Sequence, residues 1–564
     1  MIKLPTILTR SPMKSRKGLI SVKQAYLKIL SVILVLAIIG LSVVGNYGIT
    51  WDEPIEVDMV SHNLEYIREN KPISEMSRHY GFYFNYISQL IYESKEKFFP
   101  ATPNLPPNPT DKDKWLSRIW QITRVKHVVT FLFSLITYLS VVGIVAILAG
   151  IESAWLGALI LALFPAFWGH SFFNPKDIPF AAMFTLGTFA GSLLLDKYFQ
   201  SENQAIKLGF NRLTVYSCLY GILAGLITGI RIGGFFILFY LIFAHLVGRW
   251  DIKTLPKTVW RFLPLYAVII LFWAITTYIV HPAAWRNPIT WFIEAITLMS
   301  KFNIWDNTVL FDGQNIPGRS LPWYYLPRLF SLTTPVLLQI AVLLGVMGIL
   351  TKMTKLTPSQ RACALITLLQ AFLLPSVAIL RQSTLYDGIR HFLFVIPALA
   401  AIASTAIIWT YHKLKRKSIK IFLTTLLILN FSVIVYDMIS LHPYEYTYYN
   451  RAYGGLKAAQ GQQETDYWGL SLKEGMEWLN QNAAANSTIV VSGPMFAAEM
   501  VQDYQKNLTM IYRDDFAWGK APDPDYYMGL SRYDYFQAFP HCPTVHAVQR
   551  QDTPLTIIKD CRQP

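Results

Sequence analysis

Long apolar runs separated by short charged segments fill the first 440 residues of the chain. A helix needs about 20 apolar residues to cross a bilayer, and about eleven runs approach that length. The runs that begin near 153 and 233 are short, so their ends are poorly defined. The predicted spans are 28–47, 127–149, 153–169, 178–196, 213–230, 233–248, 262–280, 334–351, 362–380, 392–411 and 420–438. The pattern predicts an α-helical polytopic membrane protein with about 11 transmembrane helices.

Basic residues gather in alternate loops between these runs. They are Lys197, Lys207, Arg212, Arg249, Lys253, Lys257, Arg261, Lys352, Lys355, Arg361, Lys413, Lys415, Arg416, Lys417 and Lys420. Short loops rich in Lys and Arg stay in the cytoplasm, so the N-terminus is predicted to be cytoplasmic. An odd number of spans then places the C-terminus outside. The first run lacks a convincing cleavage site, so we expect it to be a retained helix. The expected location of the protein is a plasma (inner) membrane.

Polar segments are expected on the outer face. The first outer loop, residues 48–126, contains two amphipathic stretches near 54–70 and 79–99, which suit the membrane interface. A Pro-rich turn from Pro100 to Pro109 follows them. The other outer loops are 170–177, 281–333 and 381–391.

The tail is predicted to be a separate soluble domain, which divides the chain into a transmembrane part, 1–440, and an outer-face part, 441–564. Its sequence favours a small α/β unit. The helix-like runs are 471–482 and 495–504, and the strand-like runs are 488–491 and 556–558. Cys542 and Cys561 lie 19 residues apart in this tail. This spacing neither requires nor excludes a disulfide, which would form only if the tail faces an oxidising compartment.

Composition supports the membrane class. Apolar residues make up 53% of the 564 residues, and the formal net charge is +15. Mean hydropathy is +0.33. Because the basic residues sit mainly in loops between apolar helices, the charge is a topology signal, and we expect no nucleic-acid partner.

Acidic residues mark the candidate chemistry at the outer ends of helices. Asp52 and Glu53 directly follow the first apolar run, and Asp177 precedes the fourth. A carboxylate there suits a general base that takes a proton from an acceptor hydroxyl. The structural alternatives are that Asp52 and Glu53 only begin the next helix and that Asp177 only caps one. These three acids are hard oxygen ligands, so a divalent metal also stays open, without a spacing that demands one.

Cations lie at the same predicted depth as these acids. Lys176, Arg286 and Arg390 flank apolar runs on the outer side, and Arg231 lies between two such runs. Cations of this kind hold a leaving phosphate as its charge develops. We therefore predict phosphate contacts for these four and for His391. The alternatives are structural ion pairs, snorkelling of Arg231, and a core histidine at His391.

Several motifs together carry a family resemblance. Besides the acidic pair they are Asn174-Pro175-Lys176-Asp177, Pro322-Trp323-Tyr324-Tyr325-Leu326-Pro327, Asp387-Gly388-Ile389-Arg390-His391, His442-Pro443-Tyr444-Glu445-Tyr446, Tyr448-Tyr449-Asn450 and Glu464-Thr465-Asp466-Tyr467-Trp468-Gly469. With them, most of the chain resembles the GT-C superfamily of integral-membrane glycosyltransferases. Within it, the chain is similar to the dolichyl-phosphate-mannose protein mannosyltransferase-like family, which includes bacterial aminoarabinose transferases that modify lipid A.

The resemblance implies an inverting transfer of a sugar from a polyprenyl- or dolichyl-phosphate donor. Asp52 then corresponds to the base, with Glu53 beside it and Asp177 as the recurring second acid. The acceptor is a hydroxyl or phosphate of a protein, a lipid or a glycan on the outer face. The third outer loop is too short for the β-trefoil insert of eukaryotic relatives, which implies a prokaryotic member.

Two other functions compete with this interpretation. A transporter or flippase of a lipid-linked substrate is disfavoured by the odd span count, the large outer domain and the lack of matching halves. A non-catalytic scaffold is disfavoured by the intact acidic and basic positions. The change Asp52→Asn separates a transporter from an enzyme, because only the enzyme needs a base.

Overall fold

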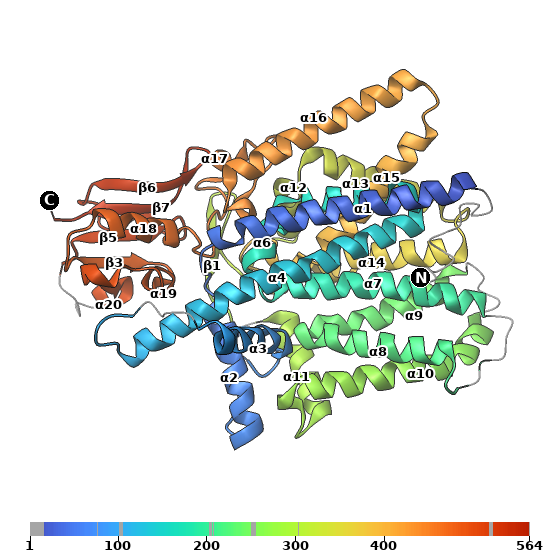
Figure 1. The fold of residues 1–564 in the computed structure, drawn as a ribbon, viewed down its shortest axis with the longest axis horizontal. Coiled ribbons are helices and arrows are strands. Elements are labelled where there is room, and N and C mark those ends of the chain that lie inside the picture. The colour runs from blue at the N-terminus through green and yellow to red at the C-terminus, as the bar shows by residue number, and fades with distance from the viewer. Residues whose placement is uncertain are drawn as a thin grey trace.

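The apolar helices run side by side as a bundle, and a small sheet domain lies at one end of it (Figure 1). The computed structural model describes residues 16–562, except 76, 101–104, 202–205, 207, 250–254, 303 and 518–522. The predicted loop cations Lys207 and Lys253 and part of the predicted Pro100–Pro109 turn lie outside the described residues.

Each predicted span is matched by at least one helix. The helices of the bundle are α1 (Arg16–Val43), α4 (Asp111–Ala149), α5 (Trp155–Ala162), α6 (Pro165–Phe173), α7 (Asp177–Gln200), α8 (Arg212–Ile230), α9 (Phe236–Gly248), α10 (Leu255–Val280), α12 (Tyr325–Thr333), α13 (Val336–Lys352), α14 (Pro358–Arg381), α15 (Val395–Lys413) and α16 (Lys417–Leu441). The chain is therefore a multi-pass, mainly helical membrane protein, as predicted.

The number of crossings differs from the prediction of eleven. Among the described residues, eight helices are long and apolar enough to cross a membrane, or up to ten if each of two bent pairs is one span. The pair α5–α6 bends by 73° and the pair α12–α13 by 119°. Helix α9 and the 3-10 turn before it form one shorter apolar helix, Ile232–Gly248, which is not among these crossings.

The two ends of the bundle differ in what they carry. The C-terminal ends of α7 and α15 and the N-terminal ends of α8 and α16 lie at the end of the bundle away from the sheet domain (Figure 1). The sequence places basic residues such as Lys197, Arg212 and Lys413 at these helix ends. The end of α1 and the beginnings of α2 and α7 lie toward the sheet domain. The opposite placement agrees with the predicted alternation, and the assignment of inside and outside stays a prediction.

The first loop contains the two predicted interfacial helices, α2 (Glu53–Glu69) and α3 (Tyr83–Phe98). Helix α2 points away from the bundle, across the direction of the long helices (Figure 1). The third loop contains α11 (Pro288–Lys301) and a hairpin of β1 (Thr308–Phe311) and β2 (Gln314–Pro317) that was not predicted.

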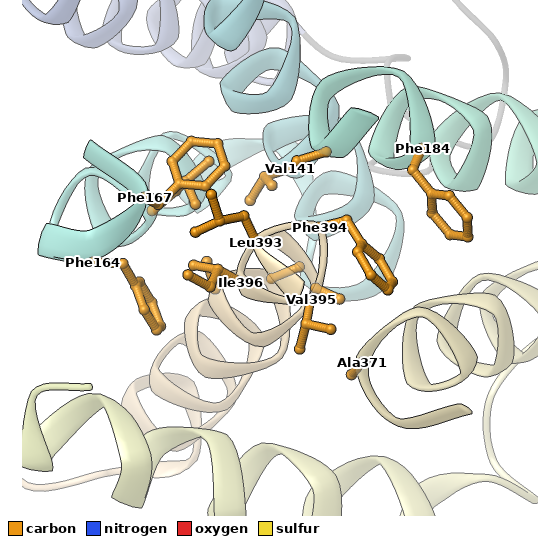
Figure 2. Packing of buried hydrophobic residues seen from close by; sticks show 14 of the residues in the cluster. Val141, Phe164, Phe167, Phe184, Ala371, Leu393, Phe394, Val395 and Ile396 are labelled. Carbon is orange, nitrogen blue, oxygen red and sulfur yellow. The ribbon is translucent and has the colours of Figure 1, made fainter. Parts of the chain in front are cut away.

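The bundle core fixes the segment that precedes α15. Aromatic and aliphatic side chains from α4, α6, α7 and α14 pack around residues 393–396 (Figure 2). The Phe394 ring lies 5.4 Å from that of Phe180 and 5.2 Å from that of Phe184, both on α7. Leu393 is fully buried. This packing holds the short 3-10 turn Arg390–Phe392 against the start of α7.

The C-terminal domain is the predicted small α/β unit. Its strands are β3 (Thr488–Ser492), β4 (Thr509–Tyr512), β5 (Tyr526–Leu530), β6 (Thr544–Arg550) and β7 (Thr553–Asp560). They form one sheet in the order β4-β3-β5-β7-β6, parallel between β3 and its two neighbours and antiparallel elsewhere. Its helices are α17 (Gly455–Ala459), α18 (Leu472–Asn482), α19 (Met495–Glu499) and α20 (Arg513–Ala517). Cys542 and Cys561 form a disulfide.

Candidate active site

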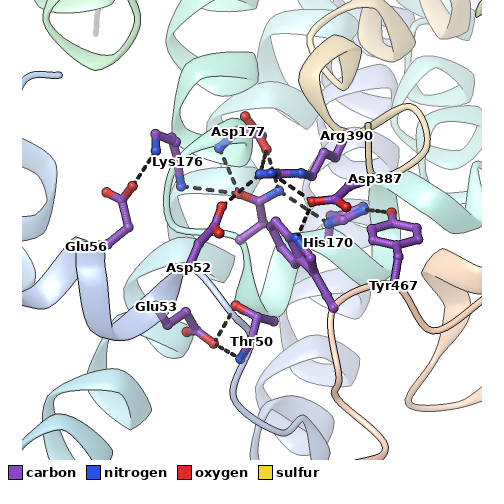
Figure 3. A network of polar contacts seen from close by, with 12 residues as sticks. Thr50, Asp52, Glu53, Glu56, His170, Lys176, Asp177, Asp387, Arg390 and Tyr467 are labelled. Carbon is purple, nitrogen blue, oxygen red and sulfur yellow. Dashed lines mark hydrogen bonds and ion pairs between the residues drawn. The ribbon is translucent and has the colours of Figure 1, made fainter. Parts of the chain in front are cut away.

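At the start of α2, the side chains of the adjacent acids Asp52 and Glu53 point in different directions. Glu53 Oε2 accepts hydrogen bonds from the backbone N–H of Thr50 (2.9 Å) and from its hydroxyl (3.2 Å). The other oxygen of Glu53 lies 2.8 Å from Nε2 of His127 on α4. Glu53 is 0% exposed. Both of its oxygens are thus used inside the protein, and Asp52 faces the other way (Figure 3).

Asp52 is the more open of the two carboxylates. Its side chain is 30% exposed, and Oδ2 accepts a hydrogen bond of 2.9 Å from Nη1 of Arg390. Burial raises the pKa of Asp52, but the charges of Arg390, Lys176 and Arg231 outweigh it, so the pKa lies below the ordinary value. Among the described residues, no hydrogen bond or ion pair is found at Oδ1 of Asp52. The carboxylate is therefore ionised at neutral pH with one oxygen available.

Asp177 begins α7 and is held from both sides. Asn174 Oδ1 accepts from the backbone N–H of Asp177 (2.8 Å), and Asn174 Nδ2 donates to Asp177 Oδ2 (2.9 Å). Asp177 Oδ1 accepts a hydrogen bond from Arg231. Oδ2 also lies 3.8 Å from Nη1 of Arg390. Because Asp177 is 2% exposed, its two oxygens are enclosed by these partners.

Arg390 links the acids of the cluster. Besides Asp52 and Asp177, its guanidinium contacts Asp387 through Nη2 at 2.9 Å. The group lies over the Trp468 ring at 4.6 Å and over the Tyr386 ring at 5.1 Å. Burial opposes the charge of Arg390, but the nearby carboxylates outweigh it and raise the pKa. Arg390 is a permanent cation at the centre of the site (Figure 3).

Lys176 pairs with an acid that the sequence analysis did not single out. Its Nζ lies 2.6 Å from Oε1 of Glu56 and 3.9 Å from the centre of the Tyr80 ring. Glu56 Oε2 accepts a hydrogen bond from Asn85 (2.6 Å). Burial opposes the charge on Lys176, but Glu56 outweighs it and raises the pKa. The signal for Glu56 is its spacing of four from Asp52, which places both on one face of α2.

A cavity of about 490 Å³ lies beside the cluster, between α7, α9, α11 and α14. Arg231, His391 and Tyr80 lie among its polar wall residues. Its apolar lining includes Phe180, Ile232, Phe235, Phe236, Leu374, Val377, Ala378 and Phe394. Burial and three neighbouring cations, Arg390 foremost, lower the pKa of His391, so it is neutral at pH 7. The lining of the cavity combines apolar side chains with two cations, Arg231 and Arg381.

Arg286 does not join the other predicted cations. Its guanidinium donates to Asn70 and lies 5.7 Å from the Tyr66 ring, at the far end of α2. Helix α2 has 17 residues and is about 26 Å long. The structure therefore brings together Asp52, Lys176, Asp177, Arg231 and Arg390, with His391 alongside, and keeps Arg286 apart from them.

A metal finds no ready ligand set. In the part of the chain that the structure describes, no three His, Cys, Asp or Glu side chains are arranged to hold a metal ion. Glu53 points away from Asp52, and guanidinium groups contact both Asp52 and Asp177. This donor set does not fit the divalent metal that the sequence left open.

Sequence reasoning missed part of the cluster. Lys126 of α4 is 1% exposed, and its ammonium has no hydrogen-bond partner among the described residues. The charges of Glu56 and Glu53 act on it. A lysine just before an apolar run is typical of a headgroup anchor, so its position alone does not distinguish Lys126. Arg532 of the tail also reaches the site, from a segment without a motif that marks it.

No family model matches the chain, and no curated protein matches it. Among solved structures, apo ArnT from Cupriavidus metallidurans matches with a TM-score of 0.45 at 12% identity, over 94% of this chain and 97% of that chain. ArnT bound to undecaprenyl phosphate matches with a TM-score of 0.41 at 14% identity, over 95% and 98%. The apo oligosaccharyltransferase of Archaeoglobus fulgidus matches with a TM-score of 0.39 at 13% identity, over 85% and 64%.

This chain is thus similar over most of its length to ArnT and to the oligosaccharyltransferase, at low sequence identity. At these scores the likeness carries no information on the reaction of this chain.

Proposed function

We propose that this protein is an inverting glycosyltransferase that moves a sugar from a polyprenyl-phosphate donor to an acceptor on the outer face of the membrane, with Asp52 as the base. The observation that carries the proposal is the state of Asp52. It is an ionised carboxylate with one available oxygen, in a cluster that also holds Lys176, Arg231 and Arg390. Glu53 and Asp177 are enclosed by protein partners.

The cavity beside the cluster suits the donor. A polyprenyl chain is apolar and belongs against Phe180, Leu374 and Val377, whereas its phosphate belongs beside Arg231, which also lines the cavity. Nε of Arg231 is buried without a hydrogen-bond partner among the described residues. A buried donor of this kind is costly unless it finds an acceptor, and a phosphate oxygen provides one.

The reaction then follows from the placement of the groups. Asp52 Oδ1 takes the proton of the acceptor hydroxyl while that oxygen forms a bond to the anomeric carbon. The bond from this carbon to the phosphate oxygen breaks, and its electron pair leaves with the polyprenyl phosphate. Arg231, Arg390 and Lys176 stabilise the charge on the leaving phosphate. An acceptor and a leaving group in line invert the anomeric configuration.

Glu53 takes a supporting role in this mechanism. Its carboxylate ties Thr50 to His127 and so fixes the backbone on which Asp52 is carried. A base must reach its proton within hydrogen-bond distance, which requires a rigid support. Glu53 is thus a positioning residue, and the proton transfer belongs to Asp52.

The proposal is tested in proteoliposomes with a panel of undecaprenyl-phosphate-linked hexoses and pentoses. Acceptors are supplied as separate lipid, protein and glycan fractions, and the release of undecaprenyl phosphate is measured. We expect one donor to turn over and the product to have the opposite anomeric configuration by NMR. Retention of configuration contradicts the in-line mechanism. Movement of intact donor across the bilayer without sugar release favours a flippase.

A further inference from the structure

The buried ion pairs of the site continue into the C-terminal domain. Asp387 Oδ2 contacts Arg390, and Asp387 Oδ1 lies 2.7 Å from Nη2 of Arg532. Arg532 lies two residues after the end of strand β5, so it belongs to the sheet domain. The same Nη2 lies 3.6 Å from Glu464 Oε1. Carboxyl and guanidinium groups therefore alternate across the two parts of the protein, in the order Asp52, Arg390, Asp387, Arg532 and Glu464.

Each inner member of this alternating series is almost completely removed from water. The side chains of Arg390, Asp387 and Arg532 are 4%, 7% and 7% exposed. Buried ion pairs are screened little, and the loss of one partner leaves an uncompensated charge on the other. Arg532 is further fixed because it donates a hydrogen bond to the backbone carbonyl of Tyr467.

The backbone alone does not fix Asp387. Asp387 and Gly388 have φ values of 56° and 63°, in the left-handed region, within the short segment between α14 and α15. The carboxylate is instead held by side chains of the tail. Trp468 Nε1 donates to Oδ2 at 3.1 Å, and Arg532 holds Oδ1. Both partners come from residues C-terminal to the last membrane helix, α16.

We propose that Arg532 is a positioning residue of the active site, through which the C-terminal domain orients Asp387, then Arg390, and finally Asp52. The inference rests on the proposed function, since it concerns the same base. Arg390 is shared between Asp52 and Asp387, and Arg532 neutralises Asp387 from the other side. Without Arg532, Asp387 keeps Arg390 as its remaining close cation and draws it away from Asp52.

The sharing of Arg390 between Asp52 and Asp387 predicts a shift in the pKa of Asp52, which a purely structural role of Arg532 does not produce. The charged groups around Asp52 are Arg390, Lys176, Arg231 and Asp177. Weaker contact with Arg390 raises the pKa of Asp52, because that cation is the foremost charge that lowers it. The rate falls on the acid side as Asp52 becomes protonated. The acid limb of the kcat profile therefore moves to higher pH when Arg532 is removed.

The test compares wild type, Arg532→Met, Arg532→Lys and the double variant Arg532→Met/Asp387→Asn in proteoliposomes. The substrate is the undecaprenyl-phosphate sugar from the panel that turns over fastest. We expect kcat of Arg532→Met to fall about 10-fold or more, with the acid limb shifted upward and KM changed less than kcat. Arg532→Lys keeps part of the rate, and the double variant recovers the position of the acid limb because Asp387 no longer carries a charge.

The matched control is Arg550→Met. Arg550 is another arginine of the domain, which contacts Glu474 at 2.7 Å and the carbonyl of His442 at 2.8 Å, apart from Arg390. It should leave the acid limb unchanged. The inference is overturned if Arg532→Met retains the wild-type kcat and pH profile. It is also overturned if Arg532→Met loses rate but its acid limb does not move, or if adding Asp387→Asn does not move the acid limb back. Each of these results is distinguished from failure of the proposed function, because that failure appears as an active Asp52→Asn enzyme.

Discussion

Replacing Glu53 by glutamine separates the support of the site from its base. The amide has nearly the shape of the carboxylate, and its oxygen still accepts from Thr50. Its NH₂ group, however, faces Nε2 of His127, where the carboxylate oxygen lies at 2.8 Å. One charge-assisted contact at a fully buried position is lost, which costs about 1–3 kcal/mol of folding free energy.

The effect on the rate is expected to be smaller than the loss of a base. A general base contributes about 10²–10⁴-fold, whereas a shifted support reduces the rate by roughly 10-fold or less and leaves the acid limb in place. Thermal unfolding in detergent and turnover in proteoliposomes measure the two effects together. A loss of 10²-fold or more in an enzyme that unfolds at the wild-type temperature would refute the reasoning, because Glu53 would then carry the proton transfer.

Three further outcomes follow from the site. Arg231→Lys should raise the donor KM and lower kcat by about 10²–10³-fold, because lysine lacks the fork that serves Asp177 and a phosphate together; steady-state kinetics checks this. Arg286→Ala should leave turnover within about 3-fold of wild type in the same assay, since Arg286 contacts Asn70 at the far end of α2. The depressed pKa of Asp52 keeps the active carboxylate ionised as pH falls, so we expect a rate that stays level between about pH 5 and 8 and declines only on the acid side of its ordinary pKa, measured as kcat against pH.

The apolar runs predict the bundle well because hydropathy is a local property. The number of crossings is less well predicted, since a bend such as that between α5 and α6 depends on the neighbouring helices. Pro165 is the local signal for that break. The β1–β2 hairpin had a signal as well: Asp312-Gly313 has positive φ at both positions, as a tight two-residue turn requires.

The site shows which information the sequence lacks. Side and depth in the membrane predict one coordinate, and the three residues placed at one level, Asp52, Asp177 and Arg390, lie together in the structure. Position within the membrane plane is a second coordinate, and only packing sets it. Arg286 has the same predicted depth, but α2 carries its contact residues away from the cluster. Arg532 lies in the soluble domain, where an arginine after a strand is ordinary until the domain docks.

Turnover of purified Asp52→Asn is the most direct test of the central claim, that Asp52 is the base of a sugar transfer. The control is Glu65→Gln, an equal change at an acid on the same helix whose side chain is 45% exposed. Both proteins should unfold at temperatures close to that of the wild type. We predict that Glu65→Gln turns over donor normally and that Asp52→Asn loses at least about 10²-fold in kcat. A folded Asp52→Asn enzyme with near-normal kcat would contradict the account.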